Sequence, residues 1–185
     1  MIIAQKKRKE NIAEYLLYMW QVEDLLRAYK LDIDRINETV IARYDATDEQ
    51  KAQIKDWYEG LIKMMELENA KQSGHLQINK NVILRLTDLH IQLLHSDKFP
   101  EYTARFYSAL PYIVELRAKS GEDKSGEIET CFRALYGTLM LKLQGKPISE
   151  GTAQAMREIT MFVTLLTSLY HKNEEKPLFE DYDNN

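Results

Sequence analysis

The segment Asn11 to Tyr29, NIAEYLLYMWQVEDLLRAY, constrains the fold most, because its apolar residues recur at the spacing of an α-helix. At about 100° per residue, one arc collects six of them, as in a helix that lies on a core. They are Ile12, Tyr15, Leu16, Met19, Val22 and Leu26. Leu17 and Tyr18 fall outside this arc and Trp20 lies near its edge. We therefore expect a helix that is buried on most sides or shares a face with a second chain.

One carboxylate lies in this helix where a hydrocarbon is expected. Glu23 falls between Leu16 and Met19, inside the apolar arc. A buried carboxylate without a partner costs several kcal/mol or becomes neutral. Glu23 must therefore find a partner, reach water or take part in chemistry, and a structural pair is the simplest of these interpretations.

The rest of the chain repeats the helical spacing. Helices are predicted from a capping box at Thr47 to about Gln72, over 76–95, from Pro100 to about 118, over 127–143, and from Ser149 or Thr152 to about His171. Residues 11–44 form either one long bent helix or two, with Asp32 or Asp34 as a cap. Pro111 predicts a kink or a helix in two pieces. In the segment 127–143 the predicted inner stripe is Ile128, Cys131, Phe132, Leu135, Leu139 and Leu143.

These segments predict an all-α fold: a single-domain bundle of six or seven helices, with the first and last helices central. The chain has 185 residues, which suits one domain, and its 7 glycines and 4 prolines are few for an all-β protein. We expect one helical domain over residues 1–171. Residues 172–185 are expected to be an acidic, partly disordered tail.

Composition limits the partners and the compartment. The formal net charge is -4, so nucleic acid is an unlikely partner, and residues 1–9, a basic tip, are expected to be a frayed terminus. The longest uncharged run near the C-terminus, Ile159 to Tyr170, is shorter than the ~18 residues of a membrane span, so no membrane partner is predicted. The start of the chain lacks the order and size of a signal peptide, and we expect a cytoplasmic protein.

The motifs of familiar cofactor and metal sites do not occur in the sequence. No Glu-x-x-His pair, no His-Glu-x-x-His motif and no glycine-rich dinucleotide turn is found, and the single cysteine, Cys131, excludes a cysteine-based zinc cage. We therefore predict no cofactor and no metal. Cys131 lies within an apolar stripe, which is typical of a small buried hydrophobe.

Two further polar side chains interrupt an apolar face. Asn79 and His90 both fall on the inner side of the helix predicted over 76–95. If this helix packs on the first one, Glu23 and His90 can form a buried carboxylate–imidazole pair, the arrangement that tunes a general base. Tyr15 and Trp20 would then lie near that pair and line a pocket.

Two stretches resemble a known family. EYLLYMWQVEDLLRA (Glu14 to Ala28) and SGEIETCFRALYG (Ser125 to Gly137) resemble a bacterial family, the domain of unknown function 4924, seen mainly in Bacteroides-like bacteria. The resemblance implies a small all-helical protein with no assigned activity, and it carries over no catalytic or binding residue.

Two functions are open on this basis. The leading expectation is a non-catalytic helical protein that acts through protein–protein contacts, with a homodimer as the expected assembly, because the first and last helices carry excess apolar surface. The alternative is an enzyme or small-ligand binder with a pocket between helices around Glu23 and His90.

Overall fold

The computed structural model describes residues 2–119, 121 and 125–179, and this part of the chain is all-α. It holds eight α-helices and one 3-10 helix, with no β-strand among the described residues. In chain order they are α1 (Ile2–Glu10), α2 (Ile12–Ala28), α3 (Ile33–Thr39), η1 (Ile41–Arg43), α4 (Asp48–Leu67), α5 (Gln77–Leu94), α6 (Pro100–Lys119), α7 (Glu127–Leu143) and α8 (Glu150–Glu175). The predicted fold class is confirmed, whereas the predicted count of six or seven helices is too low.

The additional helices come from the N-terminal region. Residues that were expected to form a frayed tip instead form α1, which ends before Asn11. The Asn11 side-chain oxygen accepts from the Ala13 N–H at 3.0 Å, so a new helix begins there. α2 then ends in a turn at which Lys30 and Leu31 have φ angles of 56° and 63°. Asp32 caps α3 by accepting from the Arg35 N–H at 3.0 Å, so residues 11–44 do not form one long helix.

The ends of α4 illustrate one correct and one wrong prediction. The capping box is present, because the Thr47 hydroxyl accepts from the Gln50 N–H and the Gln50 side chain accepts from the Thr47 N–H. The helix ends at Leu67, earlier than predicted. Asn69 adopts a left-handed conformation with φ of 57°, and the Ala70 N–H donates back to the Met65 carbonyl at 2.9 Å. Asparagine tolerates this conformation, so no glycine is needed to stop the helix.

Two helices are longer than the sequence indicated. α6 runs through Pro111 as one continuous helix, so the predicted alternative of two pieces is wrong, whereas the predicted kink stays a prediction. α8 continues to Glu175, four residues past the predicted end at His171. The last six residues of the predicted acidic tail lie outside the described residues.

The structure divides into two compact units. The first unit comprises residues 1–10 and 14–82, and the second comprises residues 11–13 and 83–185. α2 and α5 each contribute residues to both units. The prediction of one helical domain over residues 1–171 stays a prediction, as does the central position of the first and last helices.

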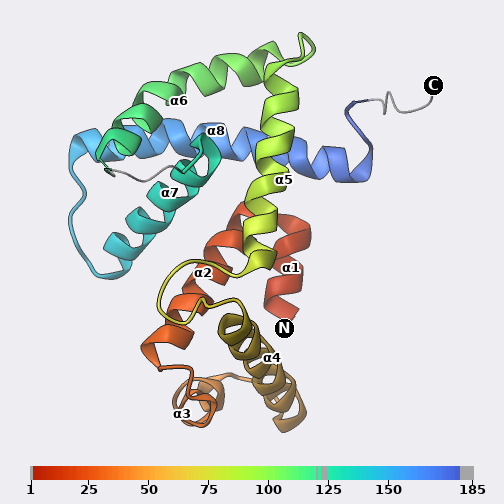
Figure 1. Cartoon of the computed structure of the whole chain (residues 1–185), viewed down its shortest axis with the longest axis vertical. Coiled ribbons are helices and arrows are strands. Elements are labelled where there is room, and N and C mark those ends of the chain that lie inside the picture. Colours follow the sequence, from red (N-terminus) through yellow and green to blue (C-terminus); the bar gives the residue numbers. More distant parts are fainter. Residues whose placement is uncertain (1, 120, 122–124, 180–185) are drawn as a thin grey trace. The chain divides into compact units, whose positions relative to one another are not determined.

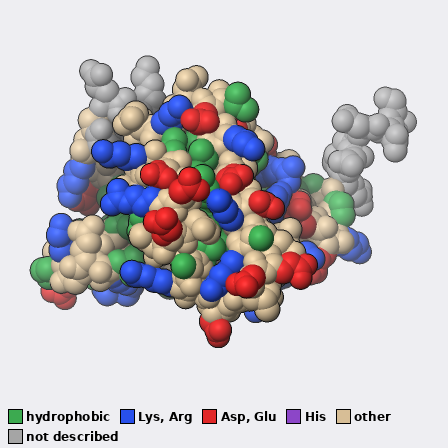
Figure 2. All heavy atoms as spheres, turned by 90° about the horizontal axis from the view of Figure 1, so that it is seen from below, with side chains coloured by type: hydrophobic (Ala, Val, Ile, Leu, Met, Phe, Trp, Pro, Cys, Tyr) green, Lys and Arg blue, Asp and Glu red, His purple; other side chains and the backbone are tan. Residues whose placement is uncertain are grey.

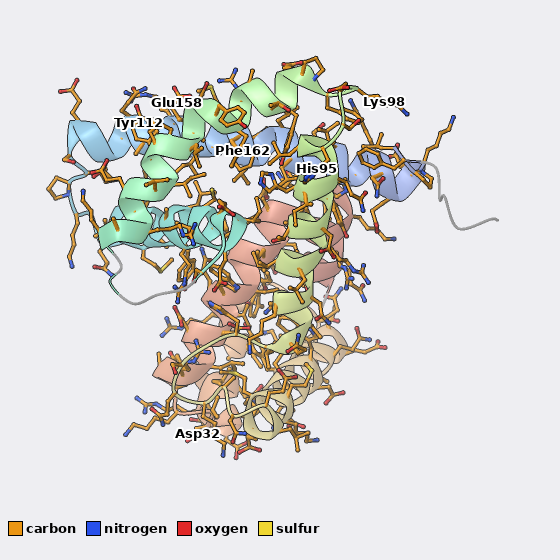
Figure 3. All side chains as sticks on the ribbon, turned by 45° about the horizontal axis from the view of Figure 1, so that its top comes forward. Asp32, His95, Lys98, Tyr112, Glu158 and Phe162 are labelled. Carbon is orange, nitrogen blue, oxygen red and sulfur yellow. The ribbon has the colours of Figure 1, made fainter. Side chains whose placement is uncertain are left out.

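In the second unit, α8 packs against α6 and α7, and these two helices also contact each other (Figure 1). Phe162 of α8 and Phe106 of α6 lie side by side, with ring centroids 5.4 Å apart (Figure 3 labels Phe162). Cys131 of α7 is buried, and burial raises the pKa of its thiol to about 12. The cysteine is therefore the small buried hydrophobe that the sequence predicted.

The start of α2 is tied to this unit through its backbone. The Ile12 N–H donates to Nε2 of His171 at 3.1 Å, so a side chain of α8 satisfies one free donor of the first turn of α2. The six residues of the apolar arc predicted for this helix are at most 5% exposed, which confirms the predicted face.

The described helices lack the features of a membrane span, since none combines the length and apolar character that crossing a bilayer requires. On the face drawn in Figure 2, acidic and basic side chains are interspersed. This face therefore carries no large patch of a single charge.

Candidate functional site

Glu23 is the centre of a buried polar cluster in the first unit. Its side chain is 0% exposed, and Oε1 accepts two hydrogen bonds, from the Leu76 N–H at 2.9 Å and from the Asn79 amide at 2.6 Å. Its Oε2 lies 2.6 Å from Nδ1 of His75, whose ring N–H donates to the carboxylate. The carboxylate therefore finds the partners that its burial requires.

His75 is held from two directions. Nδ1 faces Glu23, and the imidazole ring stacks on the buried indole of Trp20 with centroids 4.1 Å apart and planes 10° apart. The His75 side chain is 24% exposed, whereas that of Glu23 is fully buried. The cluster thus has one interior carboxylate and one imidazole that reaches the surface.

Arg27, one turn after Glu23, fastens the loop before α5. Its guanidinium donates to the Ala70 carbonyl at 3.1 and 3.2 Å and also to the Gly74 carbonyl. It forms an ion pair with Asp24 at 2.8 Å and lies 4.0 Å from Glu23. The loop that carries His75 is therefore tied to α2 by both charged side chains.

Asn79 serves the cluster as a donor. Its amide nitrogen donates to Glu23, while its buried Oδ1 has no hydrogen-bond partner within the described part of the chain. An unsatisfied buried acceptor costs about 1–3 kcal/mol. This cost offsets part of the stabilisation from the hydrogen bond that the Asn79 amide donates to Glu23.

Glu23 also supplies a hydrogen-bond acceptor at the start of α5. α5 begins at Gln77, so the Leu76 backbone N–H lies at its N-terminus, where free N–H groups need acceptors, and the side-chain amide of Asn79 donates from the first turn. A carboxylate there is also favoured by the helix dipole. Glu23 thus caps α5 from a neighbouring helix. In chemical terms, the carboxylate of Glu23 on Nδ1 orients the imidazole of His75, which is an arrangement that general bases share.

The structure brings together three of the five predicted site residues. Glu23 and Asn79 are hydrogen-bonded, and Trp20 joins them through its stacking on His75. Tyr15 is buried two turns earlier, with the Arg8 guanidinium 5.7 Å from its ring centroid. Burial raises the pKa of Tyr15, with a smaller opposing effect of Arg8 and a further raising effect of Glu23.

The predicted partnership of Glu23 with His90 is replaced by other contacts. His90 belongs to the second unit, where its Nδ1 lies 2.5 Å from the Tyr102 hydroxyl. Its ring packs edge-on against Phe106 at 4.7 Å and Phe162 at 5.6 Å. Burial lowers the pKa of His90, and the carboxylate of Glu127 opposes this effect only in part. His90 is thus a hydrogen-bonded core histidine.

His75 is the residue that sequence reasoning missed. It lies in the loop between α4 and α5, where no periodic pattern marks it. One signal was present in the sequence: His75 precedes Asn79 by four residues, and Asn79 interrupts an apolar face. His75 lies just before α5, so a carboxylate that meets Asn79 in the first turn of this helix can also reach the loop residue before it.

A second feature of interest is the apolar surface at the end of α7. The buried residues of this helix all precede Arg133, although Leu135, Leu139 and Leu143 continue the predicted inner stripe. Leu141 is 36% exposed and Leu143 is 69% exposed. The second half of α7 therefore presents hydrocarbon to solvent, where a buried stripe was predicted.

The described residues contain no cluster of three or more His, Cys, Asp or Glu side chains arranged to hold a metal ion. A family model, that of the domain of unknown function 4924, matches residues 1–177. No curated protein and no solved structure matches the chain.

Proposed function

The chain belongs to the DUF4924 family, and because that membership assigns no activity, we propose a function from its surface: a non-catalytic helical protein that acts as a homodimer through α7. The observation that carries this proposal is the exposed apolar surface of the second half of α7. Contiguous apolar surface on a folded protein is typical of an interaction site.

The charge pattern of this surface supports a protein partner. Between Ala134 and Gly145 the only charged residue is Lys142, and six residues are Leu, Met or Tyr. All of them are half-buried or exposed. The core of a protein–protein interface is likewise depleted of charge and enriched in large apolar side chains.

Gly137 supplies the reason to expect another helix on this surface. It lies in the middle of the apolar half of α7, it is exposed, and a Cβ atom placed on it would meet no atom within 4 Å. A glycine inside a helix costs about 1 kcal/mol relative to alanine, and among the described residues no close packing against Gly137 offsets this cost. An approaching helix does, because a missing side chain lets two backbones come close.

The partner proposed is a second copy of this chain. In a two-fold interface the same patch meets itself, so α7 can cross its symmetry mate at Gly137 with a glycine on each side of the axis. Leu141 of each copy, one turn after Gly137 on the same side of the helix, then covers apolar surface of the other copy. The exposed Arg133, one turn before Gly137, pairs with Glu129 of its own chain at 3.8 Å.

The first test is the mass of the protein in solution at micromolar concentration. We expect about twice the monomer mass of 21.7 kDa by multi-angle light scattering. Gly137→Leu should weaken the dimer about 10-fold or more, because overpacking a close contact costs about 1–3 kcal/mol.

Gly60→Leu is the matched control for this substitution. Gly60 is also an exposed glycine inside a helix, α4, with no atom within 4 Å of an added Cβ. Both substitutions raise helix propensity. A difference in dimer affinity between the two variants is therefore due to the interface and not to the folding of the monomer. A monomeric wild-type protein, or equal dimerisation of the two variants, would rule the proposal out.

The alternative function, a ligand pocket around Glu23 and His90, has weaker support. Each of these side chains is hydrogen-bonded within its own unit, Glu23 to His75 and His90 to Tyr102. Groups that already satisfy one another are less available to a ligand.

A further inference from the structure

We propose that a cavity in the first unit binds a small organic cation that carries an apolar body, such as an aromatic primary amine. The cavity has a volume of about 400 Å³, within the range of about 300–1,000 Å³ that is usual for ligand sites. Its walls come from α1, from the turn after η1 and from α4. They are Ile3, Gln5, Tyr44, Asp45, Ala46, Gln50, Gln53 and Ile54.

Two interactions fix the wall formed by the turn. The capping box of Thr47 and Gln50 closes with bonds of 3.0 and 3.2 Å, so the turn enters α4 in one defined conformation. The Tyr44 hydroxyl lies 3.4 Å from that of the buried Tyr58. The ring of Tyr44 is thereby held in place beside the cavity, so this part of the site is formed before a ligand arrives.

The polar lining residues have free hydrogen-bonding groups. Among the described residues, the side-chain amides of Gln5 and Gln53 have no hydrogen-bond partner, and Asp45 has no ion pair. Gln50 differs, since its side chain is engaged in the capping box. Two carboxamides and one carboxylate are thus available to orient a ligand.

The charge of the residues that line the cavity favours a ligand of positive charge. Asp45 is its only ionisable group that is charged at neutral pH, since the remaining lining residues are apolar, amides or tyrosine. A carboxylate attracts a cation, and the face of an aromatic ring such as that of Tyr44 attracts a cation by about 0.5–2 kcal/mol. An anion of the same shape gains neither interaction.

The apolar part of the lining selects the body of the ligand. Ile3 is 41% exposed, although its side chain is hydrocarbon, and Ile54 is only half-buried. Both line the cavity from opposite helices, α1 and α4. A flat apolar group between them would remove this surface from water.

The experiment compares two probes of similar size and opposite charge, tryptamine and indole-3-propionate. Binding to the full-length protein is measured by calorimetry. We expect tryptamine to bind at least about 10-fold more tightly than indole-3-propionate. Asp45→Asn should remove most of this preference, because it keeps the shape of the side chain and removes its charge.

The location of binding is tested separately. In nuclear magnetic resonance spectra of the wild-type protein, tryptamine should shift the signals of the Gln53 side-chain amide and the Ala46 methyl group. Ile54→Trp should fill the cavity and abolish binding, whereas Gly60→Leu, on the same helix but with open space around it, should leave binding unchanged.

Three results would overturn the proposal. They are the absence of tryptamine binding at millimolar concentration, equal affinity for the two probes, and signal shifts that spare Gln53 and Ala46. The shifts are recorded on the unmodified protein, so this outcome remains decisive even if Ile54→Trp does not fold.

Discussion

Replacement of Glu23 by alanine is the most direct test of the buried cluster. The substitution removes the acceptor of three hydrogen bonds, from His75, the Leu76 N–H and the Asn79 amide. His75 is partly exposed and can turn to water, whereas the Leu76 and Asn79 donors are buried. The expected result is a large loss of stability, because two buried donors lose their acceptor.

The magnitude follows from those two donors. Each buried donor without an acceptor costs about 1–3 kcal/mol, so Glu23→Ala should lower the free energy of unfolding by about 3–5 kcal/mol. Glu23→Gln should cost only about 1–2 kcal/mol. It keeps one oxygen for Leu76 and Asn79, and its amide can donate to Nδ1 of the other His75 tautomer.

The assay is urea denaturation, with hydrogen exchange of the Leu76 amide as the local measurement. Exchange at Leu76 should accelerate in Glu23→Ala and remain slow in Glu23→Gln. The matched control is Glu14→Ala on the same helix, where the glutamate side chain is 59% exposed and pairs with Lys7 at 2.8 Å. Loss of this surface ion pair should cost at most about 1 kcal/mol.

Two results would refute the reasoning. If Glu23→Ala costs no more than Glu14→Ala, the carboxylate does not stabilise the fold. If Glu23→Ala leaves the Leu76 amide protected, this donor has another acceptor, and the cap on α5 is not provided by Glu23.

Two further predictions concern the second unit. Burial lowers the pKa of His90 below its usual 6.5. Just below pH 6.5, the unfolded chain therefore binds a proton at His90 more readily than the folded chain does. The contribution of His90 to the free energy of unfolding is complete above pH 6.5. It falls as the pH is lowered below 6.5, by up to about 1.4 kcal/mol per pH unit. His90→Gln should reduce this pH dependence in urea denaturation measured at several pH values. On α7, Phe132→Ala should lower the free energy of unfolding by about 3–5 kcal/mol, because Phe132 is fully buried. Leu143→Ala, at a position 69% exposed, should change it by less than about 0.5 kcal/mol, and comparable losses in the two variants would contradict the exposed end of α7.

Hydrophobic spacing by itself determined the helices and the sides they bury. The bounds of α7 and the apolar arc of α2 agree with prediction, because an amphipathic helix carries its inner face in every turn. The capping box at Thr47 is equally local, since both of its hydrogen bonds join residues three apart. Local pattern predicted the end of α4 wrongly, because Asn69 adopts a left-handed conformation and ends the helix at Leu67, before the predicted end near Gln72.

The tertiary structure alone decided which partners the buried polar groups have. The sequence showed that Glu23 needs a partner, but the spacing within one helix carries no information about a loop 52 residues away. His75 was therefore missed and His90 was chosen, although His90 is satisfied by Tyr102. The periodicity of α7 also predicts which side of the helix faces inward. It does not predict how much of that side a neighbouring helix covers. Burial depends on atoms that are distant in sequence, so Leu143 lies in solvent on a stripe that begins with the buried Ile128.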